Sequence, residues 1–340
     1  MYLIIKKFLF LFDPEKAHHI AMFGLRVANI FGLLRLLPQV PKCKSRVLFN
    51  ITFENPVGLA AGLDKNAEYL NIFSKLGFGF LEVGTITPLP QPGNSKPRSF
   101  RLTKEEGIIN RFGFNNVGID KAINNIKSSN FSGILGVNIG KNFSTPIESA
   151  AEDYLIGFRK SYLYATYIVI NISSPNTKNL RQLQGYDFFE KLISSIKSEQ
   201  NKLTKYHNKY TPFLVKISPD ASDQDLVNIC NIALKFKVDG IIATNTTIER
   251  DSVTLNPQHK ESGGLSGKPL YAKALKTQKY ICNRLQNKIP VIGVGGIMSG
   301  RDGVERLENG ADLIQIYSGL IFKGHNLIHE LCKKIQQIKS

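Results

Sequence analysis

Residues 171–177 (Asn-Ile-Ser-Ser-Pro-Asn-Thr) are dense in amide and hydroxyl side chains and directly follow a short apolar run, residues 167–170. Such a run is typical of a buried strand, and loops after buried strands often carry binding or catalytic groups because the strand fixes the backbone. Asn, Ser and Pro are also ordinary turn formers. On its own, the stretch is compatible with a reactive loop or with a capped turn.

Seven other short apolar runs end in a comparable way, each at a polar side chain or a glycine. Together these run ends hold lysines, asparagines and hydroxyls, one carboxylate and no histidine. They comprise Ala61, Gly62, Leu63, Asp64 and Lys65, then Thr85, Asn138, Lys141, Lys216, Thr244, Asn245 and Thr246, and finally Gly293, Gly295, Gly296, Tyr317 and Ser318.

This set of side chains excludes several common chemistries. Paired carboxylates for glycoside hydrolysis are missing, as are a Ser/His/Asp arrangement and a histidine–carboxylate set for a metal ion. Lysines beside neutral amides suit an anionic, planar ligand that carries amide groups. Glycines after the last two runs would let backbone N–H groups approach a phosphate, and no G-x-G-x-x-G motif supports a Rossmann nicotinamide site. The residues therefore predict a phosphate-bearing cofactor and no metal, without identifying the cofactor.

From residue 47 onward, two kinds of segment that could position these groups alternate regularly along the chain. Apolar runs rich in Val, Ile and Gly alternate with amphipathic stretches, which predicts parallel strands covered by helices. Eight such units favour an α/β fold of the (β/α)8 TIM-barrel type over an open doubly wound sheet, and a barrel brings all strand ends to one rim. The predicted strands are 56–61, 80–85, 133–139, 167–172, 213–217, 240–243, 290–294 and 313–317; the predicted helices are near 67–76, 118–128, 149–164, 187–202, 223–237, 270–286, 301–309 and 325–337.

Two segments between these units need a separate interpretation. The connection 85–116 is too long for a simple crossover and predicts a hairpin or a lid, because long ordered loops are often functional. The glycine-rich segment 263–267 could form a further phosphate cradle or a flexible loop.

The composition suits a globular protein with a large core: 340 residues, 42% of them hydrophobic. The four cysteines lie far apart without a C-x-x-C pair, which indicates reduced thiols in a cytosolic compartment. The net charge is +17. Nucleic-acid binding would require a basic stripe or a known module, and neither is present. A negatively charged membrane surface or a simple compositional bias remain as explanations of the charge.

The N-terminal 37 residues differ from the rest of the chain. Residues 1–12 are strongly apolar but contain Lys6 and Lys7; they are shorter than the roughly 20 residues that span a bilayer and lack a signal-peptide cleavage site. Asp13-Pro14-Glu15 predicts a helix start. The following residues carry more apolar surface than one core face needs, which favours a helical lobe in a membrane interface over one packed wholly on the main domain. Residues 38–46 are predicted to be a linker, and 47–340 the barrel.

Long motifs spread over nearly the whole chain resemble the dihydroorotate dehydrogenase family, in its quinone-dependent, membrane-associated class (class 2). The resemblance implies FMN as cofactor, one per chain, and oxidation of dihydroorotate to orotate in pyrimidine (UMP) biosynthesis. The motifs are residues 55–65, 82–88, 90–94, 110–116, 138–142, 171–177, 243–247, 263–267 and 293–297.

The same resemblance implies which residues hold each ligand. Those matched to FMN binding are Ala61, Gly62, Leu63, Asp64, Lys65, Thr85, Asn138, Asn171, Lys216, Thr244, Gly267, Gly296, Tyr317 and Ser318. Those matched to dihydroorotate binding are Lys65, Asn110, Arg111, Phe112, Gly113, Phe114, Asn171, Asn176, Asn245 and Thr246.

The resemblance also implies that Ser174 is the catalytic base, which removes a proton from C5 of dihydroorotate while a hydride leaves C6. The soluble classes carry cysteine at this position, so Ser174 and the N-terminal lobe both indicate the quinone-dependent class. In that class the lobe forms a tunnel for ubiquinone or menaquinone, and His18, Arg101 and Tyr317 match its inner end. For His18, a position on a solvated helix face is an equal alternative.

We also expect a monomer that binds the membrane surface through residues 1–37, as a peripheral protein on the cytoplasmic face of the inner membrane, with no nucleic-acid partner. Three alternatives stay open at this point. They are a soluble-class or other FMN-dependent barrel oxidoreductase, a phosphate-binding barrel isomerase, and a non-catalytic scaffold at the membrane surface.

Overall fold

Eight parallel strands close into a barrel in the computed structural model, which describes residues 2–176 and 180–337. The fold is a (β/α)8 barrel, as predicted. The strands follow chain order around the barrel, and pairing of Ile316 in the last strand with Leu59 in the first closes it. The strands are β3 (Val57–Leu59), β4 (Phe80–Ile86), β7 (Ile134–Ile139), β8 (Tyr167–Asn171), β9 (Phe213–Ile217), β10 (Gly240–Ala243), β12 (Val291–Val294) and β13 (Leu313–Ile316).

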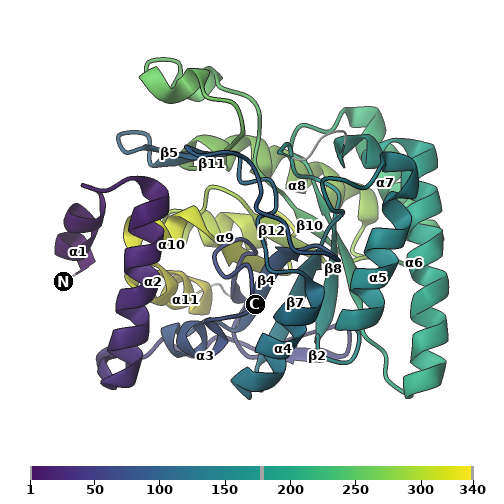
Figure 1. The fold of residues 1–340 in the computed structure, drawn as a ribbon, viewed down its shortest axis with the longest axis horizontal. Coiled ribbons are helices and arrows are strands. Elements are labelled where there is room, and N and C mark those ends of the chain that lie inside the picture. Colours follow the sequence, from purple (N-terminus) through teal and green to yellow (C-terminus); the bar gives the residue numbers. More distant parts are fainter. Residues whose placement is uncertain (1, 177–179, 338–340) are drawn as a thin grey trace.

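Helices surround the barrel and cover its outer face (Figure 1). The first predicted helix, 67–76, is shorter than expected: it starts only at Leu70, because Ala67 has a positive φ of 58° that no α-helix accommodates. The helix predicted at 187–202 continues to His207. The helices are α3 (Leu70–Phe73), α4 (Ile119–Ser129), α5 (Ala150–Ser161), α6 (Tyr186–His207), α7 (Asp223–Lys235), α8 (Tyr271–Leu285), α9 (Gly300–Glu308), α10 (Ser318–Lys323) and α11 (Asn326–Gln336).

The interior of the barrel is filled by large rings next to glycines. A Cβ atom at Gly58 would lie 2.3 Å from the Phe80 ring, and one at Gly136 would lie 2.3 Å from the ring of Tyr167. Phe53 also packs in this cluster, edge to face with Phe80 at 5.3 Å. Tight packing of this kind makes the lower barrel a solid core, so that a ligand can enter only from the opposite rim.

A short hairpin that the sequence did not predict carries Phe53 into the barrel. It consists of β1 (Arg46–Leu48) and β2 (Ile51–Phe53), joined by Phe49 and Asn50. Both turn residues have positive φ, 56° and 60°. Two-residue hairpin turns require this conformation but usually signal it with Asn-Gly or Asp-Gly, which explains why the pattern was missed.

A three-stranded antiparallel sheet lies above the carboxyl ends of the barrel strands (Figure 1). It contains β5 (Ser99–Leu102), β6 (Gly107–Asn110) and β11 (Gly264–Gly267). The predicted hairpin in 85–116 is therefore correct. The segment 263–267 is mainly the third strand of this sheet, because its backbone pairs with β6.

Two helices and a 3-10 turn precede the barrel: α1 (Tyr2–Leu9), α2 (Pro14–Ile30) and η1 (Leu33–Leu36). The first helix packs against α10, α2 packs against β5 and α3, and η1 packs against the 3-10 turn Ser74–Leu76. Asp13 caps α2 as predicted, with Oδ1 accepting from the backbone N–H of Glu15 at 2.9 Å and of Lys16 at 3.3 Å. Tyr2 donates its hydroxyl proton to the backbone oxygen of Leu320 in α10.

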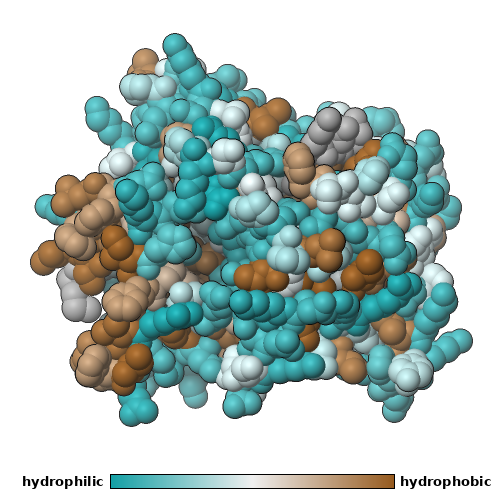
Figure 2. Space-filling model, viewed as in Figure 1, coloured by the Kyte–Doolittle hydropathy of each residue, from teal (hydrophilic) through white to brown (hydrophobic). Residues whose placement is uncertain are grey.

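Apolar side chains are concentrated on the outer surface of these first helices (Figure 2). Among the described residues, eleven of the twenty-two exposed large hydrophobic side chains fall between Leu3 and Leu36. Ile30, Phe31 and Leu36 are 74–80% exposed. None of the helices in the described parts of the chain is both long and apolar enough to cross a bilayer. The surface therefore has far more apolar area than a water-facing helix pair requires.

One ion pair joins α2 to the loops above the barrel. Glu15 accepts two hydrogen bonds from Arg98, at 2.8 and 3.2 Å, and both side chains are about nine-tenths buried. Arg98 also donates to the backbone oxygens of Pro92 and Asn94, at 2.7 and 3.0 Å. Burial alone would raise the pKa of Glu15, but the hydrogen bonds and charge of Arg98 lower it below its ordinary value of 4.5. The pair therefore stabilises the fold as long as Glu15 is ionised.

We expect Glu15→Gln to lower the free energy of unfolding at pH 7 by on the order of 3 kcal/mol, because it leaves the buried guanidinium of Arg98 without a counter-charge. Since the folded pKa of Glu15 is lowered, the difference from the wild type should be largest above pH 4.5 and should shrink as the pH falls below it. Urea unfolding of both proteins at pH 7 and pH 4 measures this. Glu148→Gln, at an exposed position, serves as control; equal effects of the two substitutions would refute the role of the pair.

Candidate functional site

A cavity opens at the carboxyl ends of the barrel strands, beneath the three-stranded sheet. It is lined from all sides of the barrel, which brings together residues up to 259 positions apart in the chain, Ala60 and Gly319. Most of the predicted site residues line it: Ala61, Gly62, Lys65, Thr85, Asn110, Phe112, Gly113, Phe114, Asn171, Ser174, Asn176, Lys216, Thr244, Asn245, Thr246, Gly267, Gly296, Tyr317 and Ser318.

Four of the residues predicted to bind FMN or dihydroorotate do not line the cavity. Leu63 is buried in the core between barrel and helices. Asp64 accepts hydrogen bonds from the backbone N–H groups of Glu68 and Tyr69, at 2.9 and 2.8 Å, and so holds the turn that carries Lys65. Asn138 is fully buried below the floor.

Arg111 is the fourth of these residues, and its side chain turns away from the cavity. Its guanidinium forms an ion pair with Glu261 at 2.7 Å and lies over the ring of Phe100, with its carbon 4.5 Å from the ring centroid.

The cavity floor rests on a buried polar cluster around Glu82 of β4, which is 0% exposed. Its carboxylate accepts from Asn138 Nδ2 at 2.8 Å and from Gln315 Nε2 at 2.7 Å, and Lys216 Nζ lies 3.7 Å away. Asn138 in turn accepts from Thr85 at 2.6 Å. Each of these side chains is therefore held in one orientation by a partner below the surface of the floor.

Asn171 joins the same cluster from β8. Its Nδ2 donates to Thr85 Oγ1 at 2.8 Å and to Asn138 Oδ1 at 3.2 Å. Its backbone oxygen accepts from the hydroxyl of the fully buried Tyr154 at 2.7 Å. The strand end that precedes Ser174 is thus fixed from both the barrel and the helix layer.

Lys65 supplies a positive charge at one end of the cavity. Within the described ranges 2–176 and 180–337, no carboxylate lies within 4.0 Å of its Nζ, and the nearest stabilising group is the Phe112 ring, 4.4 Å to the centroid. Burial lowers the pKa of Lys65 to about 8, although the charge of Glu15 acts in the opposite direction. A partly desolvated cation without a counter-ion is a receptor for an anionic ligand.

Bare backbone lines another part of the cavity. Gly296 has a φ of 75°, and a Cβ atom there would lie 2.5 Å from the backbone of Tyr271. Two hydroxyls, Ser266 and Ser318, lie 2.8 Å apart beside it. Backbone N–H groups and hydroxyls in such a cradle match the oxygens of a phosphate.

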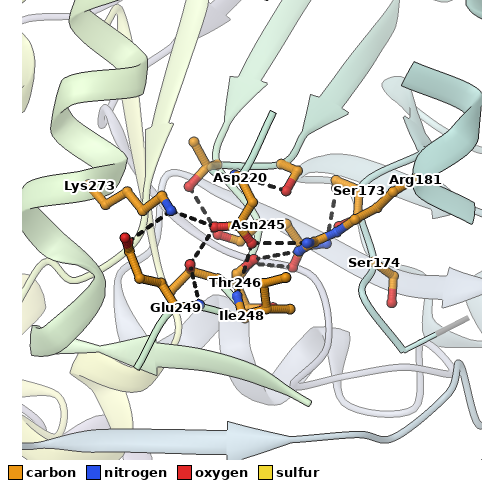
Figure 3. A network of polar contacts seen from close by, with 12 residues as sticks. Ser173, Ser174, Arg181, Asp220, Asn245, Thr246, Ile248, Glu249 and Lys273 are labelled. Carbon is orange, nitrogen blue, oxygen red and sulfur yellow. Dashed lines mark hydrogen bonds and ion pairs between the residues drawn. The ribbon is translucent and has the colours of Figure 1, made fainter. Parts of the chain in front are cut away.

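Ser174 also lines the cavity and is 5% exposed. Its Oγ accepts from the backbone N–H of Asn176 at 3.2 Å; among the described residues no other hydrogen bond to this hydroxyl is formed. Next to it, Asn245 donates to the hydroxyl of Ser173 at 3.0 Å, which links the loop after β8 to the loop after β10 (Figure 3). The end of β8 and the loop after it thus line the cavity with Asn171, Ser174 and Asn176, while Thr177, the last residue of that stretch, lies outside the described residues.

His18 and Arg101, predicted for a quinone tunnel, lie where the first helices meet the barrel. Burial and the charge of Lys65 lower the pKa of His18 to about 3, so its imidazole is neutral at pH 7. Arg101 donates to the backbone oxygens of Phe10 and Phe12, at 3.2 and 3.3 Å. Tyr317, the third residue of this set, lines the cavity itself, and burial raises its pKa to about 12.

Sequence reasoning missed Glu82 and Gln315 as parts of the site. Both are single polar residues inside apolar strands, and a buried carboxylate or amide requires partners. That signal was available in the sequence. The partners themselves come from other strands, so only the fold identifies them.

Comparisons with known proteins agree over the whole length of the chain. Residues 44–338 match the model of the dihydroorotate dehydrogenase family. Two relatives, from Methylobacillus flagellatus and Buchnera aphidicola, are described as dihydroorotate dehydrogenase (quinone). The first is 48% identical over 98% of this chain and 99% of its own length, and the second is 50% identical over 98% and 99%.

A solved structure shows the same fold. The crystal structure of the dihydroorotate dehydrogenase of Eimeria tenella in complex with ferulenol superposes with a TM-score of 0.87. It is 38% identical in sequence and covers 95% of this chain and 90% of its own.

Proposed function

The chain belongs to the dihydroorotate dehydrogenase family, and from this membership we infer its reaction. It oxidises dihydroorotate to orotate, a step of pyrimidine biosynthesis, and a quinone accepts the electrons. The observation that carries this conclusion is the match to quinone-dependent relatives over 98% of the chain, together with a barrel-mouth cavity that has a cationic and a phosphate-compatible end.

We propose that FMN is the cofactor and that its phosphate lies on the backbone of Gly296 with the hydroxyl of Ser318. Both residues line the cavity, and backbone N–H and hydroxyl groups are donors of the kind that a phosphate requires. When bound, FMN supplies a two-electron acceptor between dihydroorotate and the quinone. The further residues proposed to hold it are Ala61, Gly62, Leu63, Asp64, Lys65, Thr85, Asn138, Asn171, Lys216, Thr244, Gly267 and Tyr317.

Dihydroorotate is an anion with two ring amide groups, and the proposed substrate end of the cavity complements it. Lys65 offers a charge for the carboxylate, while asparagine side chains offer both donors and acceptors for ring N–H and C=O groups. The residues proposed to hold the substrate are Lys65, Asn110, Phe112, Gly113, Phe114, Asn171, Asn176, Asn245 and Thr246, with Arg111 included through its backbone.

Ser174 is the proposed catalytic base. C5 of dihydroorotate lies beside a carbonyl carbon, so its proton is acidified. Ser174 Oγ would take up this proton as its own hydroxyl proton passes on through a water or a neighbouring hydroxyl, and the hydride from C6 would pass to the bound flavin as the two-electron acceptor. The hydroxyl receives a hydrogen bond from Asn176 N–H, which stabilises developing negative charge on Oγ. Burial excludes bulk water from competing for the substrate proton.

The first helices are proposed as the quinone lobe and membrane anchor, with residues 1–37 resting on the membrane as a peripheral, monomeric protein on the cytoplasmic face. Their exposed apolar side chains support binding in the bilayer interface. Tyr317, His18 and Arg101 are proposed to lie along the path of the quinone, whether ubiquinone or menaquinone. A neutral His18 suits an apolar path better than a charged one would.

Mixing the purified protein with dihydroorotate in the absence of oxygen should bleach the flavin absorbance, with one FMN per chain. We expect Ser174→Ala to retain FMN but to bleach 10²- to 10⁴-fold more slowly, because a positioned base contributes about that factor. Stopped-flow absorbance measures both rates, with Ser144→Ala, at an exposed position, as control. Bleaching of the Ser174→Ala protein at the wild-type rate would exclude Ser174 as the base.

The affinity for orotate should depend on the protonation of Lys65. Because the pKa of Lys65 in the free protein is lowered to about 8, orotate should bind with constant Kd below pH 7 and about tenfold more weakly for each pH unit above 8. Titration of the flavin absorbance with orotate between pH 6 and pH 9 measures this. Lys65→Met should bind weakly at every pH, whereas Lys121→Met, at an exposed position on α4, should follow the wild type. A pH-independent wild-type Kd would contradict the assignment.

Membrane binding should depend on the apolar surface of the first helices. Phe31 is 74% exposed, and we expect Phe31→Asp to weaken binding to phospholipid vesicles at least tenfold, since burying a large side chain contributes about 1.5–3 kcal/mol. Co-sedimentation with vesicles measures the binding. Leu255→Asp changes a side chain that is 98% exposed on the barrel and should have no effect. Equal binding of all three proteins would show that the surface is not the anchor.

A further inference from the structure

The carboxylate of Asp220, in the loop after β9, is the centre of a charged network beside the cavity (Figure 3). Its side chain is 10% exposed. Oδ1 lies 2.8 Å from Lys273 Nζ and accepts from the Thr247 hydroxyl. Oδ2 lies 2.9 Å from Arg181 Nη1 and accepts from the backbone N–H of Ile248 at 2.9 Å. Two cations and two neutral donors thus satisfy this one carboxylate.

Arg181 extends the network to the two loops that carry the proposed substrate residues. Its Nε donates to the backbone oxygen of Ser173 at 3.3 Å, and its Nη2 donates to that of Thr246 at 3.2 Å. The first oxygen belongs to the peptide that enters Ser174, and the second belongs to a proposed substrate-binding residue. One planar guanidinium therefore fixes the spacing between the loop after β8 and the loop after β10.

The opposite side of the network is held by a helix. Lys273 comes from α8 and contacts both Asp220 and Glu249, each at 2.8 Å. The four side chains carry two positive and two negative charges, so they add no net charge to the cavity. None of them is among the residues that line it. Their effect on a ligand must therefore pass through the loops they hold.

The ionisation of Asp220 is maintained by its partners. Burial alone would raise the pKa of this carboxyl, but the hydrogen bonds from Lys273, Thr247 and Ile248 and the charge of Arg181 together lower it. Neutralising Asp220 would leave Arg181 and Lys273 with an excess of positive charge in a partly buried place. Arg181 would then lose its anchor and its fixed position between the two loops.

We propose that Asp220, acting through Arg181, is a positioning residue that holds the Ser173–Ser174 peptide and the Asn245–Thr246 loop at the separation which dihydroorotate requires. The identity of the ligand in this proposal rests on the proposed function. Neither Asp220 nor Arg181 is proposed to contact substrate or cofactor. The chemistry of Ser174 depends on it because a general base must lie within hydrogen-bond reach of the proton it removes.

The test uses the holoenzyme and the substitution Asp220→Asn, which keeps the shape of the side chain and removes its charge. We expect unchanged FMN content, at least tenfold weaker orotate binding, and anaerobic bleaching by dihydroorotate slowed at saturating substrate. Amide hydrogen exchange should accelerate in residues 171–176 and 244–248. Asp120→Asn removes an exposed ion pair with Lys160 on the outer helices and is the matched control; it should change none of these quantities.

A second variant, Arg181→Lys, keeps a cation beside Asp220 but cannot reach both carbonyl oxygens. It should reproduce the weaker orotate binding and the faster exchange, and so tests the proposal if Asp220→Asn does not fold. A lower melting temperature with wild-type orotate affinity and wild-type exchange would overturn the proposal and leave a purely structural role. If the wild type is not bleached by dihydroorotate, the proposed function fails; the exchange data still decide whether the network holds the loops.

Discussion

A carboxylate with no access to water, Glu82, determines how the upper barrel is built. An unpaired charge at such a depth would be prohibitively costly, so the side chain requires the amides of Asn138 and Gln315 and the ammonium group of Lys216 around it. These partners come from three other strands. Their contacts with Glu82 hold each of them in one orientation, which makes the cavity floor rigid.

The cavity offers groups suited to two kinds of recognition. Its glycines expose the backbone, whose N–H groups suit the oxygens of a phosphate whatever else the ligand carries. Its amide side chains, which come from several strand ends, and the charge of Lys65 can distinguish one planar anion from another. Both sets of groups lie on one rim because parallel strands all deliver their carboxyl ends to the same side of a barrel.

Much of this arrangement could be predicted from the sequence, because it depends on local patterns. Apolar runs located all eight barrel strands, Asp13 marked the start of α2, and long motifs indicated the family. What could not be predicted depends on contacts between distant residues or on unusual backbone. The turn at Phe49 and Asn50 contains no glycine from which it could be predicted. The positive φ of Ala67 makes α3 start later in the chain than expected.

Contacts between distant residues also determine how the side chains of the site are oriented, so their orientation could not be predicted either. A motif position fixes where a residue lies along the chain but leaves open where its charge points. Arg111 belongs to such a motif, yet its guanidinium is paired with Glu261 on the outside. Asp220 and Arg181 lie in no predicted site, since their importance arises only when two loops 70 residues apart are brought together.

The glycine–ring pairs in the lower barrel also constrain how the family can vary. Gly58 leaves space that Phe80 fills, and Gly136 does the same for Tyr167. A larger residue at either glycine is tolerable only if the ring opposite becomes smaller, and a smaller ring alone leaves a cavity. In a set of related sequences, the glycine and the ring of each pair should therefore change together or not at all, because the two residues fill one fixed volume between neighbouring strands.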